Sequence, residues 1–301
     1  MRLVVLLQAL LSLVGGPAQA EREVALLTPR EKAALVVVSG LPAPAGVAGV
    51  IVRRWDRDLP RPAGVLVFVD QEGGLVKAYP ELPPWASASA LGRVDEALAA
   101  GLETGRALRD VGVHVDLAPV LDSRDGPLGS RQFRRPELAL AFGRGLGRAG
   151  VGACAKHFPG LGSTAVSTDR AHRVRGVLRS GELAGFFRAA RVLPCVMVGH
   201  AVYPAQGSRS ASFSPWAYRL LRDRGFDGVA ITDSLGVFGS DLAPYWATSA
   251  IRAGADLVLF TKAADAERAI HALVPLARRG ELDESVARVL QWRRSLLGPG
   301  R

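Results

Sequence analysis

Ionisable side chains recur at the ends of short apolar runs in this sequence. The residues in such positions are Asp70, Glu72, Asp116, Asp122, Lys156, His157, His200, Asp233 and Lys262. A lysine at the end of a buried strand, as at Lys156, has a desolvation cost that only a partner or a ligand offsets. An acid that terminates an apolar strand, as Asp233 does, can serve as a nucleophile. We therefore take this set as the candidate site.

Some members of this set also have an ordinary structural interpretation. A carboxylate at a strand end is often a cap or an ion-pair partner, and we interpret Asp122, with Arg124 and Arg131 nearby in the sequence, as structural. His200 fits a hydrogen-bonded core histidine as well as a ligand-binding one. The chain has no HExxH motif, no CxxC motif and no pair of histidines at helical spacing, so we predict neither a metal nor a cofactor.

The apolar runs that precede these residues have the length and continuity of buried strands. Runs of roughly 4–8 residues that are continuously apolar, rather than alternating, are typical of parallel strands covered on both faces. They span residues 34–38, 47–52, 65–69, 113–119, 152–157, 195–200, 228–232 and 256–260. Helical patterns lie at residues 94–111, 136–149, 181–191, 215–224 and 243–253. This alternation predicts an α/β fold, a single-domain (β/α)8 barrel of the TIM type.

Barrels of this type carry their sites on the loops that follow the strands. The connections after the third and fifth apolar runs are long and hold most of the glycine and polar residues. We therefore expect the ionisable residues to meet at that end of the barrel.

Local capping signals predict where helices begin. Residues 28–31, Thr-Pro-Arg-Glu, form a capping box with proline at the first helical position. Ser214 and Pro215 give a similar signal, with Ser214 as the N-cap, for the helix at 215–224. The run 34–38 can be either the first strand or the body of the helix that starts at Thr28. We place the barrel domain at residues 24–301.

The first 20 residues have the three parts of a secretory signal peptide. A charged start at Arg2 is followed by an apolar stretch at 3–14 and then by small residues up to Ala20. We predict residues 1–20 to be the signal peptide, with cleavage after Ala20. An uncleaved anchor is the alternative, but the apolar stretch is shorter than the roughly 20 residues that span a bilayer. We therefore expect a periplasmic or extracellular protein with no membrane span after signal removal.

Composition and charge narrow the class of protein. With 301 residues of which 49% are apolar, the chain can bury a large core, which excludes disordered and fibrous classes. The net charge of +10 raises the question of nucleic acid. The arginines are scattered among acids, without a dense run or interleaved aromatic residues, so we predict an arginine-biased surface and no nucleic-acid partner. Nothing in the pattern indicates an oligomeric state.

Two cysteines lie inside apolar runs that are predicted strands. Neighbouring positions within one sheet rarely meet the geometry that a disulfide requires. We therefore predict that Cys154 and Cys195 are buried free thiols, although export would permit a disulfide.

Six segments of the chain together resemble one known family. In chain order they are DQEGG at 70–74, LAPVLD at 117–122, GSRQF at 129–133, KHFPG at 156–160, GH at 199–200 and GFDGVAITD at 225–233. This order is similar to that of family 3 glycoside hydrolases, in the β-N-acetylglucosaminidase branch. The resemblance runs from about residue 27 to about residue 297.

The resemblance implies an activity and a set of roles. It implies a (β/α)8 barrel that hydrolyses terminal β-linked N-acetylglucosamine, typically from peptidoglycan fragments, with retention and through a covalent glycosyl-enzyme. The expected partner is therefore a carbohydrate, a glycan that contains N-acetylglucosamine. Asp233 matches the nucleophile. The matching residues that hold the substrate are Asp70, Arg131, Lys156 and His157, and we add His200 to them.

The chain departs from the family pattern where the proton donor belongs. The family has GHG and then Asp-Ser-His, in which the Asp and His form the acid/base dyad. Here Leu161 replaces the histidine of GHG, and an ungapped count places Ser167 at the Asp and Asp169 at the His. Leu75 stands where the family commonly has an arginine.

Three interpretations of this departure remain open. Asp169 could itself be the acid/base, as in glycosidases that use paired carboxylates, if burial and the charge of Asp233 raise its pKa. A slightly longer loop could instead make Asp169 and His172 the dyad. In the third interpretation, the barrel is impaired or inactive and binds cell-wall sugars in the envelope without turnover.

Overall fold

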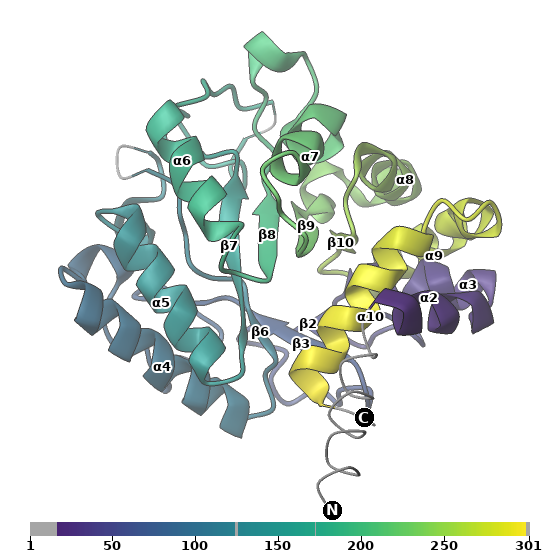
Figure 1. The fold of residues 1–301 in the computed structure, drawn as a ribbon, viewed down its shortest axis with the longest axis horizontal. Helices are drawn as coiled ribbons and strands as arrows, with labels where there is room; N and C mark the ends of the chain where they lie inside the picture. Colours follow the sequence, from purple (N-terminus) through teal and green to yellow (C-terminus); the bar gives the residue numbers. More distant parts are fainter. Residues whose placement is uncertain (1–16, 124–125, 172, 299–301) are drawn as a thin grey trace, which may run out of the picture.

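The computed structural model describes residues 17–123, 126–171 and 173–298. Across these residues, eight parallel strands close into a barrel in the order β1-β2-β3-β6-β7-β8-β9-β10, with β10 pairing with β1 (Figure 1). The strands are β1 (Val37–Ser39), β2 (Gly49–Ile51), β3 (Leu66–Val69), β6 (Val115–Asp116), β7 (Gly152–Phe158), β8 (Cys195–Val198), β9 (Val229–Ser234) and β10 (Leu257–Leu259). The predicted (β/α)8 barrel is therefore confirmed.

Helices surround the barrel and cover the outer faces of its strands (Figure 1). The α-helices are α2 (Pro17–Leu26), α3 (Pro29–Ala34), α4 (Val94–Asp110), α5 (Pro136–Arg148), α6 (Ser180–Ala189), α7 (Pro215–Arg222), α8 (Ala243–Ala253), α9 (Ala263–Arg278) and α10 (Asp283–Leu297). Short 3-10 turns are η1 (Ala88–Ala90), η2 (Gly129–Arg131), η3 (Pro204–Gln206), η4 (Ala211–Phe213), η5 (Leu235–Phe238) and η6 (Ser240–Leu242). A hairpin of β4 (Gln71–Gly73) and β5 (Val76–Lys77) follows β3.

The capping signals had different outcomes. At α3, the Glu31 amide donates to the Thr28 hydroxyl, and the Thr28 amide donates to the Glu31 carboxylate at 2.7 Å, so the capping box is confirmed. The helix continues to Ala34 and the strand begins at Val37, so the run 34–38 is divided between the two alternatives. At α7, Ser214 is the N-cap residue and Pro215 opens the helix, as predicted, but the Ser214 hydroxyl donates backwards to a carbonyl of the preceding turn and makes no capping hydrogen bond.

Helix α10 closes the amino-terminal end of the barrel. The Trp292 ring packs edge-on against Phe68, with ring centroids 5.9 Å apart. A Cβ atom on Gly152, the first residue of β7, would lie 3.1 Å from this indole, so the glycine makes room for it. Trp292 joins the apolar residues inside the barrel in one core. The carboxyl ends of the strands are therefore the open end of the barrel.

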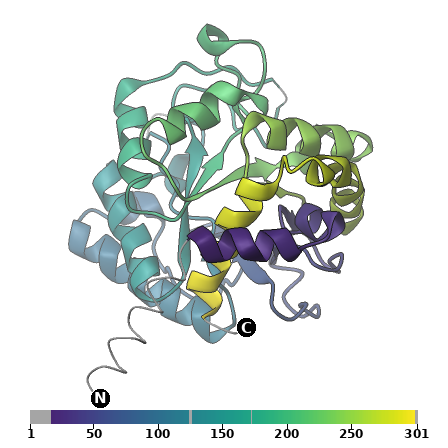
Figure 2. The same ribbon diagram turned by 45° about the vertical axis from the view of Figure 1, so that its right-hand side comes forward.

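Helix α2 packs beside α10 (Figure 2). Arg294 of α10 pairs with Glu23 of α2 at 2.7 Å, and Ala20 and Val24 of α2 are buried. The predicted cleavage point after Ala20 therefore lies within α2, while residues 1–16 of the predicted signal peptide lie outside the described residues. No helix in the described part of the chain is both long and apolar enough to cross a membrane.

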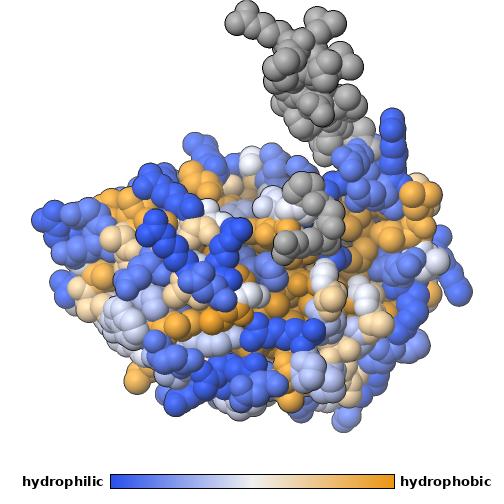
Figure 3. Space-filling model, turned by 90° about the horizontal axis from the view of Figure 1, so that it is seen from below, coloured by the Kyte–Doolittle hydropathy of each residue, from blue (hydrophilic) through white to orange (hydrophobic). Residues whose placement is uncertain are grey.

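The surface carries its charge in scattered positions. On the face shown in Figure 3, hydrophilic and hydrophobic residues are interspersed. Several arginines of the surface pair with nearby acids, among them Arg30 with Glu267 and Arg188 with Glu137.

The two cysteines form a disulfide bond, so the prediction of free thiols is wrong. Cys154 of β7 and Cys195 of β8 are register partners on adjacent parallel strands, and both side chains lie in the core inside the barrel. Their Cα atoms are 4.4 Å apart, at the short end of the range that a disulfide spans. Adjacent strands thus approach closely enough here for a disulfide bond, which neighbouring positions of a sheet rarely allow.

Replacing both cysteines with alanine should lower the free energy of unfolding by about 2–4 kcal/mol, because the bond constrains a loop of the unfolded chain. Urea unfolding of the oxidised protein and of the Cys154→Ala/Cys195→Ala variant measures this difference. A reductant should lower the stability of the parent protein and leave that of the variant unchanged. Equal unfolding midpoints for parent and variant would contradict a stabilising bond.

Candidate active site

Two cations and two carboxylates meet at the open end of the barrel. Lys156, near the end of β7, lies 2.5 Å from the Asp70 carboxylate and 2.6 Å from that of Glu72. Arg131 of η2 binds Glu72 through two parallel hydrogen bonds, at 2.7 and 2.8 Å. Asp70 and Glu72 come from the connection that begins after β3. Three separate segments therefore contribute to one charged cluster, which we call the charged clamp (Asp70, Glu72, Arg131 and Lys156).

Burial and mutual attraction compete within the charged clamp. Burial alone would raise the pKa of Glu72, but Lys156 and Arg131 lower it to about 2. Burial likewise opposes the charge on Lys156, yet Asp70 and Glu72 raise its pKa above the ordinary value. The charged forms therefore persist at neutral pH. Asp70 keeps 42% of its side chain exposed, so its carboxylate is accessible to a polar ligand.

Asp122 fixes the orientation of His157 and the chain that follows it. One carboxylate oxygen lies 2.8 Å from Nδ1 of His157, and the other accepts the Leu161 amide at 2.7 Å. The His157 amide also donates to this carboxylate. Burial would lower the pKa of His157, but attraction to Asp122 raises it overall. Asp122 is thus a positioning residue, in agreement with its structural interpretation.

Asp233 ends β9 beside two histidines. Its Oδ1 accepts the amide of Ser234 at 2.7 Å. Burial alone would raise its pKa, but attraction to His200 and His157 lowers it below the usual range. Lys156 lowers this pKa further. A carboxylate that is ionised, partly exposed and without a side-chain hydrogen bond among the described residues is available to react with an electrophilic carbon.

Both ring nitrogens of His200 have a hydrogen-bond partner within the protein. Its Nε2 lies 3.0 Å from the Ser234 carbonyl, which can only accept, so this nitrogen carries a proton. Its Nδ1 lies 2.9 Å from the Ser212 hydroxyl, and the Phe238 ring packs edge-on at 4.7 Å. Burial lowers the pKa of His200, against the attraction of Asp233. Contact with substrate stays a prediction for His200, whereas its place beside Asp233 is established by the structure.

Asp169 lies on the loop after β7 and is exposed. Its carboxylate accepts a hydrogen bond from the Ser167 hydroxyl at 3.1 Å, and its amide donates to the same hydroxyl. Burial opposes the charge of Arg131, but Glu72, Asp70 and then Asp169 raise its pKa above the ordinary value. The charge of Asp169 therefore interacts with Arg131 of the charged clamp. His172 lies outside the described residues.

The structure brings most of the predicted site together. Asp233 interacts electrostatically with Lys156, His157 and His200, and the charged clamp adds Asp70 and Arg131. Lys262 is different, because the contact found for its ammonium group is the hydroxyl of Ser240, at 3.3 Å.

Two buried acids beside the site received no role from the sequence. Asp116 is buried, accepts the Gln71 amide with one oxygen, and has no partner for the other among the described residues. Its position at the end of an apolar run had placed Asp116 in the candidate set, without a role. Glu182 accepts backbone amides from two site loops, but it follows a helix start rather than a strand, so no sequence signal marked it.

The chain matches a family model and a curated relative over most of its length. The model, described as the glycosyl hydrolase family 3 N terminal domain, matches residues 50–292. A beta-hexosaminidase from Chromobacterium violaceum is 34% identical over 274 residues, which cover 78% of this chain and 75% of that protein.

Solved structures give the same assignment. A family 3 glycosyl hydrolase from Mycobacterium smegmatis has a TM-score of 0.79 at 29% identity, covering 89% of this chain and 98% of the other. NagZ from Neisseria gonorrhoeae, in complex with N-trifluoroacetyl-D-glucosamine, has a TM-score of 0.69 at 26% identity, covering 87% and 90%. The barrel, its charged open end and these similarities together show that the chain belongs to glycosyl hydrolase family 3.

Proposed function

We propose that this protein is a β-N-acetylhexosaminidase that removes terminal β-linked N-acetylglucosamine with retention, using Asp233 as the nucleophile. The observation that carries the proposal is the ionised Asp233 carboxylate beside His157 and His200, next to the charged clamp. The names of the beta-hexosaminidase relative and of the NagZ complex support this substrate class.

The proposed reaction has two displacements. In the first, a carboxylate oxygen of Asp233 bonds to the anomeric carbon while the bond to the leaving oxygen breaks and that oxygen takes a proton. In the second, a water molecule gives up a proton, bonds to the anomeric carbon and releases Asp233. Asp70 accepts from sugar hydroxyls, and Lys156, Arg131 and His157 donate to them, which holds the anomeric carbon against Asp233.

We assign the proton transfer to the loop that carries Asp169. In its protonated form, the exposed Asp169 side chain can give a proton to the leaving oxygen, and the carboxylate that results can then take one from water. Two routes follow from the sequence, in which Asp169 acts alone or orients and charge-balances His172. Ser167 supports Asp169 by a hydrogen bond and has no acidic proton to give.

Export to the cell envelope and action on peptidoglycan fragments complete the proposal. The predicted signal at residues 1–20 supports export. The mass of the secreted protein tests it, since cleavage after Ala20 leaves Glu21 as the first residue.

Replacing Asp233 with alanine should reduce hydrolysis of 4-nitrophenyl N-acetyl-β-glucosaminide by on the order of 10³-fold or more, because the covalent step is lost. Asp227→Ala removes an exposed acid just before β9 and should leave the rate unchanged. Equal hydrolysis by the parent and Asp233→Ala would overturn the assignment. Sugar binding without any hydrolysis, lost in Lys156→Ala, would favour the non-catalytic alternative.

Replacing Asp169 with asparagine should slow hydrolysis by about 10²- to 10⁴-fold when the leaving group is a sugar. The loss should be smaller for 2,4-dinitrophenyl, which leaves without a proton. His172→Ala should show the same dependence on the leaving group if His172 transfers the proton, and no such dependence if Asp169 acts alone. Asp223→Asn, at the exposed end of α7, serves as the control for loss of one acidic charge.

Replacing Asp122 with asparagine should destabilise the protein more in acid than in base. The raised pKa of His157 stabilises the fold below the unfolded value of about 6.5, and this contribution disappears as the pH rises through the folded value. Urea unfolding at about pH 5.5 and about pH 8.5 measures the difference. In a His157→Ala background, the pH dependence of the Asp122→Asn effect should vanish; its persistence there would rule out this pair as the cause.

A further inference from the structure

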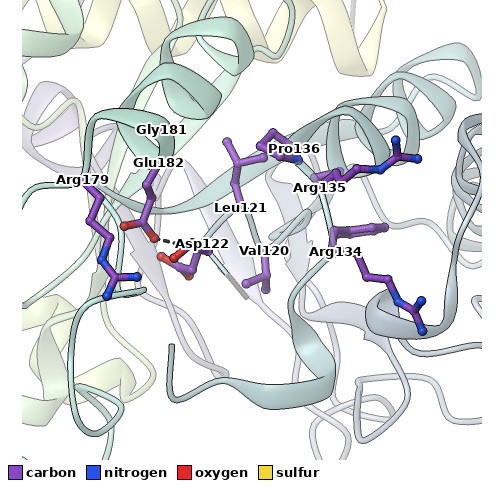
Figure 4. Close-up of a pocket in the computed structure, with 12 residues that line it drawn as sticks. Val120, Leu121, Asp122, Arg134, Arg135, Pro136, Arg179, Gly181 and Glu182 are labelled. Atoms are coloured by element: carbon purple, nitrogen blue, oxygen red, sulfur yellow. Dashed lines mark hydrogen bonds between the residues drawn. The ribbon is translucent and has the colours of Figure 1, made fainter. Parts of the chain in front are cut away.

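Glu182 is a buried acid that joins two loops of the site. It is the third residue of α6, and its Oε1 accepts the Ser123 amide at 2.7 Å and the Gly162 amide at 2.9 Å. Ser123 directly follows Asp122, and Gly162 begins the stretch that leads to Asp169. Figure 4 shows the Glu182 and Asp122 carboxylates side by side. One carboxylate oxygen therefore connects the loop after β6 to the loop after β7.

Two glycines let the backbone reach this carboxylate. Gly160 has φ of +125°, and a Cβ atom there would overlap the Glu182 carboxyl group. A Cβ atom on Gly162 would lie 2.8 Å from Oε1 and would also overlap the Ser123 hydroxyl. The Tyr203 hydroxyl donates to the Gly160 carbonyl at 2.5 Å and holds this turn from the other side. The sequence Gly160-Leu161-Gly162 is thus fitted closely around Glu182.

We infer that Glu182 is a positioning residue that fixes the start of the Asp169 loop relative to Asp122 and His157. Asp122 accepts the Leu161 amide and Glu182 accepts the next one, at Gly162, so two adjacent carboxylates hold two successive amides. This inference rests on the proposed function, in which Asp169 must stay aligned with Asp233. We call the two hydrogen bonds from the Ser123 and Gly162 amides to Glu182 the tether. Loss of the tether should affect the rate of the chemical step more than binding of the sugar.

The charges around Glu182 determine the pH range in which its carboxylate is ionised and the tether is strongest. Burial and the charge of Asp122 raise the pKa of Glu182 to about 6, against the amide bonds from Ser123 and Gly162 and the charge of Arg179, which lower it. The two amide bonds therefore favour the ionised carboxylate. Tyr203 is a further ionisable group near this carboxylate, and burial, followed by the charges of Asp122 and Glu182, raises its pKa. Arg134 and Arg135 line the same cavity of about 450 Å³ but lie across it from Glu182 (Figure 4).

Glu182→Ala removes the acceptor, and Glu182→Gln keeps an oxygen acceptor without the charge. Glu182→Ala should lower kcat by about 10²-fold with little change in KM, as expected when a catalytic group is displaced. Glu182→Gln should retain most of the parent kcat. Glu137→Ala is the matched control, since this acid lies in the first turn of α5 and pairs with Arg188 at the surface. Equal losses in Glu137→Ala and Glu182→Ala, or a loss confined to KM, would overturn the inference.

The pH dependence provides a second measurement, which also serves if Glu182→Ala does not fold. The ratio of parent kcat to Glu182→Gln kcat should exceed 1 at about pH 7.5 and fall towards 1 at about pH 5, because the parent loses its charge between these values. A ratio that does not change with pH would contradict the role of the ionised carboxylate.

Amide hydrogen exchange separates this inference from the proposed function. Peptides covering residues 160–163 and Ser123 should exchange faster in Glu182→Ala than in the parent and in Glu137→Ala, whether or not the protein hydrolyses any sugar. Where Glu182→Ala does not fold, Glu182→Gln should show a smaller increase at neutral pH. If the parent protein hydrolyses no sugar, the proposed function alone is refuted. If amide exchange in both Glu182 variants equals that in the parent, the tether is refuted.

Discussion

The burial of a lysine ammonium group is the constraint on which the site depends. Lys156 exposes only 3% of its side chain, and desolvation of a charge to that degree is costly unless it is paired. Asp70 and Glu72 provide the pairing, and Arg131 balances the second negative charge. Removing one partner from a buried pair leaves an uncompensated charge at a cost of about 3–5 kcal/mol, so the Lys156 ammonium group requires its carboxylate partners. Pairing of these buried charges therefore requires that the three segments carrying them, which are distant in the sequence, lie together in the fold.

Beneath the charged clamp, the loops are ordered by a different kind of contact. Asp122 and Glu182 bind backbone amides, so they fix the path of the chain rather than the position of another side chain, apart from the His157 ring. Hydrogen bonds from amides to a carboxylate are charge-assisted and stronger than those between neutral groups. The Asp169 loop is therefore firmly anchored at its beginning, even though Asp169 itself is exposed.

The barrel could be predicted from the sequence because buried parallel strands appear as short, continuous apolar runs. The runs at 152–157 and 228–232 are apolar, and both correspond to barrel strands, β7 and β9, which carry Lys156-His157 and Asp233 near their carboxyl ends. The features that could not be predicted from the sequence depend on strand register and on contacts between distant segments. The disulfide required knowing that Cys154 lies directly opposite Cys195, and the role of Glu182 required knowing that a helix start reaches two glycines. Ser214 occupies the predicted N-cap position, but the direction of its hydroxyl, towards a carbonyl of the preceding turn, depends on a turn that the local pattern does not specify.

The closure of the barrel by Trp292 has a consequence for the order of events in the proposed reaction. With the amino-terminal end filled by this indole, the proposed reaction would have substrate enter and both products leave through the same opening. The aglycone departs first, because water must reach the anomeric carbon before the sugar is freed. The free sugar is then the last product on the protein and occupies the place that the next substrate needs. Inhibition by N-acetylglucosamine would therefore be competitive, and the pace of turnover at high product concentration would depend on emptying this single opening.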